Sequence, residues 1–341
     1  MDGNATSTRV LGRQRPLSAV AADRLDLVRY ATLAASSHNT QPWKFRIKAD
    51  EISIYPDLSR RCSAVDPDDH HLYASLGCAL ENLCLSAQAA GFAPDVTYDD
   101  REPCLRVALE PSSRLRSTRF EAIPNRQCSR SEYSREPLPL DQLRALERAA
   151  AGAGVSLMLL TDDRQKREIA EYVAEGNKAQ FADPRWTAEM RKWLRFNPRE
   201  AEHTGDGLYG PCFGNPTVPG WLGRRIIRFA MNAASQTRKD RVQIASSSAI
   251  AVVCSDTSDR RHWILAGRSF ARLALEATAL GLSTAFINQP VEVPSLRSQL
   301  ASYLGLGSRR PDLVIRIGRG PQLPRSLRRP LEQVIMEALD D

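Results

Sequence analysis

The densest group of polar side chains in the first half of the sequence lies at Ser36–Gln41 and is followed by Pro42 and Trp43. Hydroxyl and amide side chains on one turn can offer several hydrogen-bond donors and acceptors to a flat heteroaromatic ring or its polyol tail. In the alternative interpretation, the segment is an ordinary loop whose polar side chains satisfy their own backbone before Pro42 forces extension. Spacing alone favours the ordinary loop.

Arginine is concentrated at the C-terminal end of the chain. Seven arginines between Arg309 and Arg329 face a single acid, Asp312. The net charge is +7, and the 41 arginines against six lysines also indicate a bias across the whole chain. No aromatic platform or helix-turn-helix pattern accompanies the arginines, so we expect no nucleic-acid partner. A small anionic ligand needs only two or three of them.

The motifs of other chemistries are missing. The seven cysteines form no Cys-x-x-Cys pair, and the five histidines fall at no zinc-ligand spacing, so we expect reduced thiols and no metal. His70 and His71 are adjacent, but there is no His-Glu-x-x-His and no Gly-x-Ser-x-Gly. The sequence therefore predicts neither a metalloprotease nor a serine hydrolase.

Composition predicts an ordinary globular protein. With 341 residues, 42% hydrophobic and 26% charged, the chain is long enough for one large domain or two modest ones. Its longest apolar runs, such as Ala249–Cys254, fall far short of the roughly 18 to 20 residues that span a bilayer. Residues 1–15 are polar and contain no apolar signal core. We therefore expect a cytoplasmic protein without a membrane partner.

One internal repeat indicates how the chain is organised. Residues 72–92 align with residues 262–282, matching Gly77 with Gly267 and Gly91 with Gly281. Both segments carry apolar residues near helical spacing and end at a glycine that can adopt the left-handed conformation. We expect two long, mostly buried helices, although two helices rich in alanine and leucine can also be similar by chance.

The segments around these helices predict two α+β units in tandem, joined by a linker at residues 111–118. Periodicity and capping residues predict further helices at 23–35, 140–151, 164–195 and 294–304. Strands are expected at 43–48, 51–55, 94–98, 104–109, 155–160, 249–254, 283–288 and 313–317.

One stretch fits neither unit. Residues 203–223 hold six glycines, and a loop of this length inside a compact domain is usually functional or disordered. We interpret it as a lid. Residues 224–234, which follow, have the basic and apolar pattern of an amphipathic helix, and the simpler alternative for them is a surface helix packed on the body.

Four stretches resemble the nitroreductase superfamily of flavin mononucleotide (FMN) oxidoreductases. Ser36-Ser37-x-Asn39-x-Gln41-Pro42-Trp43 is similar to the Ser-Ser-x-Asn-x-Gln-Pro-Trp signature of that family. Residues 126–130 with Tyr133 resemble its phosphate-binding opening, residues 279–290 the segment along the central flavin ring, and residues 325–330 the terminal basic run. As a whole, the chain resembles the double-length, Acg-like branch.

The resemblance implies an intramolecular pseudo-dimer. Family members form dimers with the flavin at the interface, where one subunit gives the phosphate arginines and the other the Ser-Ser-x-Asn loop. Here the loop occurs only in the first half and the arginine opening only in the second. The implied organisation is a first unit at 1–110 and a second at 119–341, with a lid insertion at about 196–243 and a basic tail. Such a chain would keep one flavin site and would be a monomer or a weak homodimer.

The resemblance also implies the residues that bind FMN. Arg126, Arg130 and Arg329, with Ser129 nearby, would hold the phosphate, and the Asn288–Gln289 turn would offer a backbone N–H to flavin N5. Cys128 stands where serine or threonine is usual, and Ala35 where proline is frequent. No protein acid or base is implied as catalytic. The full set of expected cofactor-binding residues is Ser36, Ser37, Asn39, Gln41, Arg126, Ser129, Arg130, Asn288, Gln289, Arg328 and Arg329.

Two functions follow as expectations. In the first, the protein is an enzyme that moves a hydride from NADH or NADPH to flavin N5 and then to a nitroaromatic or quinone-like acceptor. In the second, it is a non-catalytic stress protein that sequesters FMN beneath a closed lid. The expected fold in both cases is the α+β nitroreductase-like fold, built from two tandem half-units.

Overall fold

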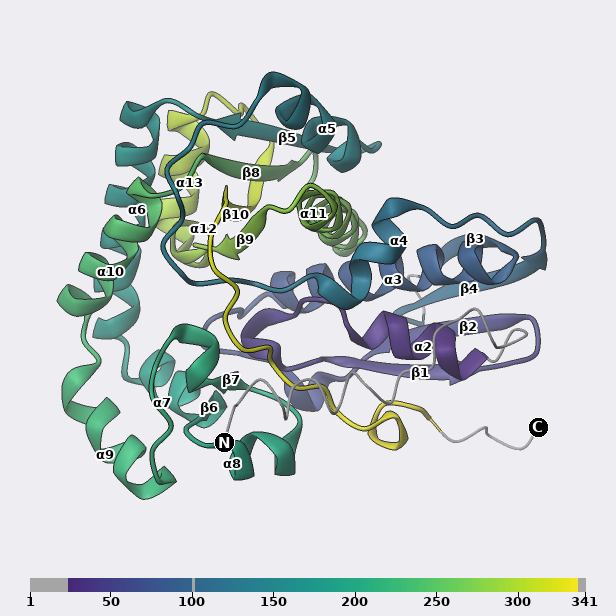
Figure 1. Ribbon diagram of the computed structural model, residues 1–341, viewed down its shortest axis with the longest axis horizontal. Coiled ribbons are helices and arrows are strands. Elements are labelled where there is room, and N and C mark those ends of the chain that lie inside the picture. Colours follow the sequence, from purple (N-terminus) through teal and green to yellow (C-terminus); the bar gives the residue numbers. More distant parts are fainter. Residues whose placement is uncertain (1–23, 100–101, 337–341) are drawn as a thin grey trace.

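The computed structural model describes residues 24–99 and 102–336, which form an α+β fold (Figure 1). Two four-stranded antiparallel sheets succeed one another along the chain, each with a long helix on one face. The expected fold class of two tandem α+β half-units is thereby confirmed. Within the described residues, no helix has the length and apolar character needed to cross a bilayer.

The first sheet has the strand order β1-β2-β4-β3. Its strands are β1 (Trp43–Ile47), β2 (Glu51–Pro56), β3 (Phe92–Asp99) and β4 (Cys104–Pro111). The accompanying helices are α2 (Arg24–Thr32), α3 (His70–Ala90) and α4 (Thr118–Ala122). Helix α3 ends where expected, because Gly91 takes the left-handed conformation at a φ of 97°.

The second sheet has the strand order β5-β8-β10-β9. Its strands are β5 (Val155–Leu160), β8 (Ala249–Ser255), β9 (Ser283–Phe286) and β10 (Arg310–Gly318). Its helices are α5 (Leu140–Ala150), α6 (Asp163–Ala182), α10 (Ala233–Ala245), α11 (Arg260–Ala279), α12 (Gln289–Glu292) and α13 (Pro294–Tyr303). Figure 1 shows α6, α10 and α13 on one side of this sheet and α11 on the other, facing the first unit.

The two repeat helices cross at their matched glycines. A Cβ atom on Gly77 would lie 2.1 Å from the carbonyl oxygen of Ile264, and one on Gly267 would lie 1.9 Å from that of Ala74. Neither distance is possible, so only glycine lets the two backbones approach this closely. The repeat found in the sequence therefore corresponds to a symmetric contact between α3 and α11, and one continuous apolar core spans both units.

The C-terminal segment returns to the first unit. After β10 the chain runs across to strand β1, where the Phe45 N–H donates to the Val334 carbonyl (2.7 Å) and the Met336 N–H donates to the Phe45 carbonyl (2.8 Å). Figure 1 shows this segment in yellow beside the first sheet. This return of the C-terminal segment to the first unit places the C-terminal arginines next to the Ser36–Gln41 turn.

The expectation of an irregular loop at residues 203–223 is wrong in its local structure. The segment contains the end of α8 (Pro198–Thr204), strand β7 (Leu208–Tyr209), a 3-10 turn (Gly210–Phe213) and the start of α9 (Gly220–Ala230). It follows α7 (Pro184–Trp193) and β6 (Leu194–Arg195), which pairs in parallel with β7. The glycines serve turns: Gly205 ends α8 in the left-handed conformation at a φ of 63°.

Candidate functional site

The Ser36–Gln41 turn has an unusual backbone. His38, Asn39 and Gln41 all have positive φ, at 49°, 54° and 53°. Non-glycine residues rarely adopt this conformation, and several together persist only where surrounding contacts hold them. Local bonds contribute here, because the Asn39 N–H donates to the Ser36 carbonyl and the Gln41 N–H donates to the Ser36 hydroxyl, both at 3.0 Å. Specific hydrogen bonds therefore hold the turn in this conformation, which a simple connection would not need.

The Asn39 side chain joins three distant segments. Its Nδ2 donates to the carbonyls of Gly207 and Leu327, each at 3.2 Å, and its Oδ1 accepts from Arg328 Nη1 at 3.1 Å. Asn39 is buried and also borders the narrow pocket described below. Its amide therefore fixes the turn against both the segment that contains Gly207 and the C-terminal tail.

Gln41 also joins distant segments through its side-chain amide. Its Nε2 donates to the Gly205 carbonyl (2.8 Å), and its Oε1 accepts the backbone N–H of Arg329 (2.9 Å). The Arg329 guanidinium donates to the Gln41 carbonyl at 3.2 Å and lies 3.5 Å from the Asp57 carboxylate. Both side chains are buried and engaged in joining the two units.

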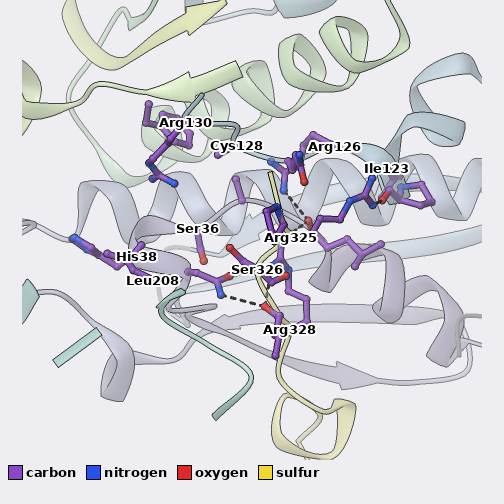
Figure 2. Close-up of a pocket in the computed structure, with 18 residues that line it drawn as sticks. Ser36, His38, Ile123, Arg126, Cys128, Arg130, Leu208, Arg325, Ser326 and Arg328 are labelled. Atoms are coloured by element: carbon purple, nitrogen blue, oxygen red, sulfur yellow. Dashed lines mark hydrogen bonds between the residues drawn. The ribbon is translucent and has the colours of Figure 1, made fainter. Parts of the chain in front are cut away.

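A narrow pocket of about 110 Å³ lies where these segments meet (Figure 2). It contains the side chains of four arginines, and no acid occurs among the described residues that line it. Figure 2 shows these arginines coming from the start of the second unit and from the C-terminal tail. Its polar lining includes Ser36, Asn39, Arg126, Arg130, Arg325 and Arg328. A cationic, acid-free pocket of this kind suits an anion.

Arg126 has donors without acceptors. The residue is 8% exposed, and its Nη2 donates to the Leu33 carbonyl at 3.2 Å. Its Nε and Nη1 are buried and meet no acceptor within the described residues. Buried donors are normally satisfied, and leaving a charged one unpaired costs more than a neutral one. These two nitrogens indicate that an acceptor belongs in the pocket.

The other arginines of the pocket differ in what they are free to do. Arg328 donates to the carbonyls of Thr32, Leu33 and Ala34, so it caps the C-terminal end of α2. Burial is the main reason that its pKa is lowered, to about 9. Arg130 packs its guanidinium 4.3 Å from the Phe213 ring centroid. It makes no side-chain hydrogen bond within residues 24–99 and 102–336, so it is available to a ligand.

A wide cavity of about 580 Å³ adjoins the narrow pocket. The two share Ser36, His38, Arg130, Leu208 and Phe286. Ligand cavities are commonly about 300 to 1,000 Å³ and mostly apolar with a few convergent polar groups. This one fits that description, with aromatic walls and a polar end. The aromatic side chains are Phe181, Trp186, Phe196, Phe213 and Phe286.

The polar end of the wide cavity includes the Asn288–Gln289 turn. Asn288 Oδ1 accepts the Val314 N–H at 2.9 Å, which fixes the turn on β10. Gln289 Nε2 donates to Asn177 Oδ1 and Asp240 Oδ2, both at 3.3 Å. Its Oε1 is buried with no donor in the described chain. The carboxyl pKa of Asp240 is raised, chiefly by burial.

Segment 194–231 forms one wall of the wide cavity. Phe196, Leu208, Phe213, Val218 and Ile227 all line it. The segment is tied down by Asp206, whose carboxylate pairs with Arg60 and accepts from Arg195 Nη2 at 2.5 Å. Residues 203–223 therefore lie over the cavity as a lid would, although as a folded element.

His38 lies between the two cavities and was not among the expected site residues. It lines both of them, and its neutral imidazole is favoured because burial, aided by the charges of Arg130 and His71, lowers its pKa to about 4. It occupies the unspecified position between Ser37 and Asn39, so its place inside the motif was the only available signal. Phe213 was also missed, because nothing local connects it with Arg130.

The expected cofactor-binding residues fall into three groups in space. Five of them line the narrow pocket: Ser36, Asn39, Arg126, Arg130 and Arg328. Three more line only the wide cavity, which Ser36 and Arg130 also border: Ser37, Asn288 and Gln289. Three line neither described cavity: Gln41, Ser129 and Arg329. Ser129 is fully buried and donates to the Pro321 carbonyl at 3.1 Å. Cys128 is half-buried at the narrow pocket.

The chain as a whole is similar to known proteins. No family model matches the chain. A Mycobacterium tuberculosis protein named "Putative NAD(P)H nitroreductase Rv3131" is 28% identical over 89% of this chain and 88% of its own length. A second, "Putative NAD(P)H nitroreductase acg", is 21% identical over 90% of this chain and 93% of its own length. The chain is thus similar, over nearly its whole length, to proteins that are named as nitroreductases.

The similarity runs through nearly the whole length of both relatives. Solved single-length structures are more distant. NfnB from Mycobacterium smegmatis, in complex with NADPH, has a TM-score of 0.43 and 13% identity, covering 65% of this chain and 98% of its own. An FMN-bound Bacteroides fragilis nitroreductase has a TM-score of 0.38 and 16% identity, covering 60% and 89%.

Proposed function

We propose that the protein binds FMN and uses it as an NAD(P)H-dependent oxidoreductase of nitroreductase type. The observation that carries the proposal is the pair of unsatisfied, buried Arg126 nitrogens in an acid-free pocket that opens into a wide, aromatic cavity. An FMN molecule has the matching division into a small dianionic phosphate and a large flat ring.

The residues of the narrow pocket would hold the phosphate. Arg126 and Arg130 have guanidinium groups available for it, whereas Arg328 supplies positive charge while keeping the α2 carbonyls capped. Ser36 contributes a hydroxyl at the junction of the two cavities. Gln41, Ser129 and Arg329 would act on this site by holding its backbone in place.

The wide cavity would hold the ring and the reacting partners. FMN, when bound, accepts a hydride at N5 and passes it on, so the protein needs to position partners and exclude water. Aromatic walls favour a nicotinamide, a nitroaromatic or a quinone-like acceptor. The Asn288–Gln289 turn remains our candidate for a backbone N–H toward the ring.

Segment 194–231 supports a second candidate function. Because it walls the wide cavity, a permanently closed segment would keep nicotinamide off the ring. The protein would then sequester FMN without turnover. We favour the reductase, because closure requires a further assumption about motion.

The test is the visible spectrum of the purified protein, recorded before and after NADPH is added under anaerobic conditions. A yellow protein that is bleached by NADPH and regains its colour with a quinone supports the reductase. Bleaching by dithionite but not by NADPH supports sequestration. A colourless protein that takes up no added FMN would refute both.

A further inference from the structure

Helix α9 (Gly220–Ala230) leaves large apolar side chains in solvent. Trp221 is 70% exposed, Phe229 75% and Ile226 46%. Single exposed apolar residues are common, but three on one helix of eleven residues form an apolar surface of the kind that marks an interaction site. Figure 1 shows α9 at the lower left edge, away from both sheets.

The same helix is strongly basic. Arg224, Arg225 and Arg228 are all exposed, and its sequence contains no acid. Arg224 pairs with Glu200 at 2.9 Å. Arg225 and Arg228 form no ion pair with any other described residue. The helix therefore presents aromatic side chains together with two unneutralised arginines.

The opposite edge of α9 is anchored to the body. A Cβ atom on Gly223 would lie 2.3 Å from the Phe196 ring, so the helix packs closely there. Gly223, Ile226 and Ile227 line the wide cavity, so Ile226 borders the cavity although it is partly exposed. One edge of the helix is thus a cavity wall, while Trp221 and Phe229 lie at the surface.

We propose that α9 docks the protein on a bilayer surface rich in anionic phospholipid. A short helix with a basic face and exposed Trp and Phe is typical of helices that lie in the membrane interface. Its arginines complement anionic headgroups and agree with the net charge of +7. A second copy of this chain is a poorer occupant, because pairing two α9 helices would bring like charges together. This proposal departs from our expectation of no membrane partner, which was argued from the absence of a spanning segment; a surface helix needs no such length.

Docking would place a wall of the cavity at the lipid surface. Insofar as the chain is the proposed reductase, this favours acceptors that dissolve in the bilayer, such as lipophilic quinones, over water-soluble nitroaromatics. This consequence rests on the proposed function, whereas docking does not depend on it.

The test is co-sedimentation of the full-length protein with vesicles. We compare pure phosphatidylcholine with an equal mixture of phosphatidylcholine and phosphatidylglycerol. Wild type should bind only the anionic vesicles, and less at high salt. Arg225→Glu/Arg228→Glu should weaken binding at least about 25-fold, at roughly fivefold for each arginine lost. Trp221→Ala/Phe229→Ala should weaken it about tenfold or more.

The matched control is Arg144→Glu/Arg148→Glu on α5. Both residues are exposed, and this change removes the same net charge from another surface. It should retain most of the binding. Circular dichroism and thermal unfolding confirm that each variant is folded.

Three results would overturn the proposal: wild type that ignores anionic vesicles, α9 variants that bind as wild type does, or a control that loses as much as Arg225→Glu/Arg228→Glu. A lipid-free dimer that Phe229→Ala converts to monomer would assign the surface to self-association instead. None of these results depends on whether the protein holds FMN.

Discussion

At the scale of single residues, the arginines around the narrow pocket do different work. Arg126 has two buried donors without acceptors, whereas Arg328 donates to the carbonyls at the end of α2. We therefore expect Arg126 to bind a ligand and Arg328 to stabilise the fold.

Arg126→Ala should weaken FMN binding by roughly tenfold to a hundredfold, because a charge-assisted contact is typically worth about 1.5 to 3 kcal/mol. The FMN affinity of Arg126→Lys should lie between those of Arg126→Ala and wild type, since lysine keeps the charge but lacks the planar guanidinium group. Fluorescence titration with FMN measures the change, and Arg144→Ala on α5 is the control. Equal affinity in Arg126→Ala and wild type would exclude this residue as a phosphate ligand.

Arg130→Ala should also lower FMN retention while the fold survives, because its guanidinium rests on Phe213 and carries no structural hydrogen bond within the described chain. Arg328→Ala should instead lower the free energy of unfolding, because it uncaps α2. Urea unfolding and FMN titration of both variants separate the two effects.

A Cys128→Ser variant should bind FMN at least as well as wild type, since a hydroxyl replaces a weak donor.

His38 should make stability depend on pH. Its pKa is lowered to about 4 in the folded protein, chiefly by burial, from an ordinary value of 6.5. The unfolded chain therefore binds the proton first, so the stability from neutral His38 is full above pH 6.5 and is lost as pH falls toward 4. The loss has an upper bound of about 3 kcal/mol.

Urea unfolding at pH 7 and pH 5 measures this dependence, with His38→Gln as the comparison. The variant should lose less stability than wild type over that interval. Asp66 and Asp312 have pKa values raised to about 7 by burial, so they act in the opposite direction and are shared by both proteins. An identical loss in the two proteins would contradict the assignment to His38.

At the scale of elements, the crossing of α3 and α11 is the most constrained contact. Gly267→Ala would place a Cβ atom against the Ala74 backbone, which cannot move as a side-chain end can. We expect a loss of at least about 2 kcal/mol in the free energy of unfolding. The control is Gly152→Ala, where the new methyl meets the flexible end of Arg272 at 3.0 Å.

Segment 194–231 is the other element with a testable role. Phe213 lines the wide cavity and covers Arg130, so Phe213→Ala should open the cavity without removing the segment. If the segment limits access, NADPH should reduce the bound flavin faster in the variant, while dithionite reduces both proteins equally. Stopped-flow absorbance measures both rates. A slow and unchanged NADPH rate would show that another feature limits access.

At the scale of the whole molecule, the two units contribute different sides of one site. The first gives the Ser36–Gln41 turn, and the second gives Arg126, Arg130 and the returning C-terminal tail. We therefore predict close to one FMN per chain, measured by absorbance after denaturation. A ratio near two would contradict the division of one interface site between the units.

The sequence by itself determined the elements. Periodicity and end glycines are local properties, so α3, α11 and the strands of both sheets could be read from residues close together in the chain. The match of Gly77 with Gly267 predicted two similar helices, and the structure adds that the helices cross at these glycines. Ser36 and Asn39 of the turn motif line the narrow pocket, and their role in binding a cofactor stays a prediction.

Only the tertiary structure decided which residues are free to bind a ligand. Gln41 and Arg329 are 288 positions apart, and their hydrogen bond shows that both join the two units and line neither described cavity. Likewise, Arg126 differs from Arg328 only in what surrounds its donors. No local pattern encodes such a difference, because hydrogen-bond satisfaction depends on atoms that folding brings together from distant parts of the chain.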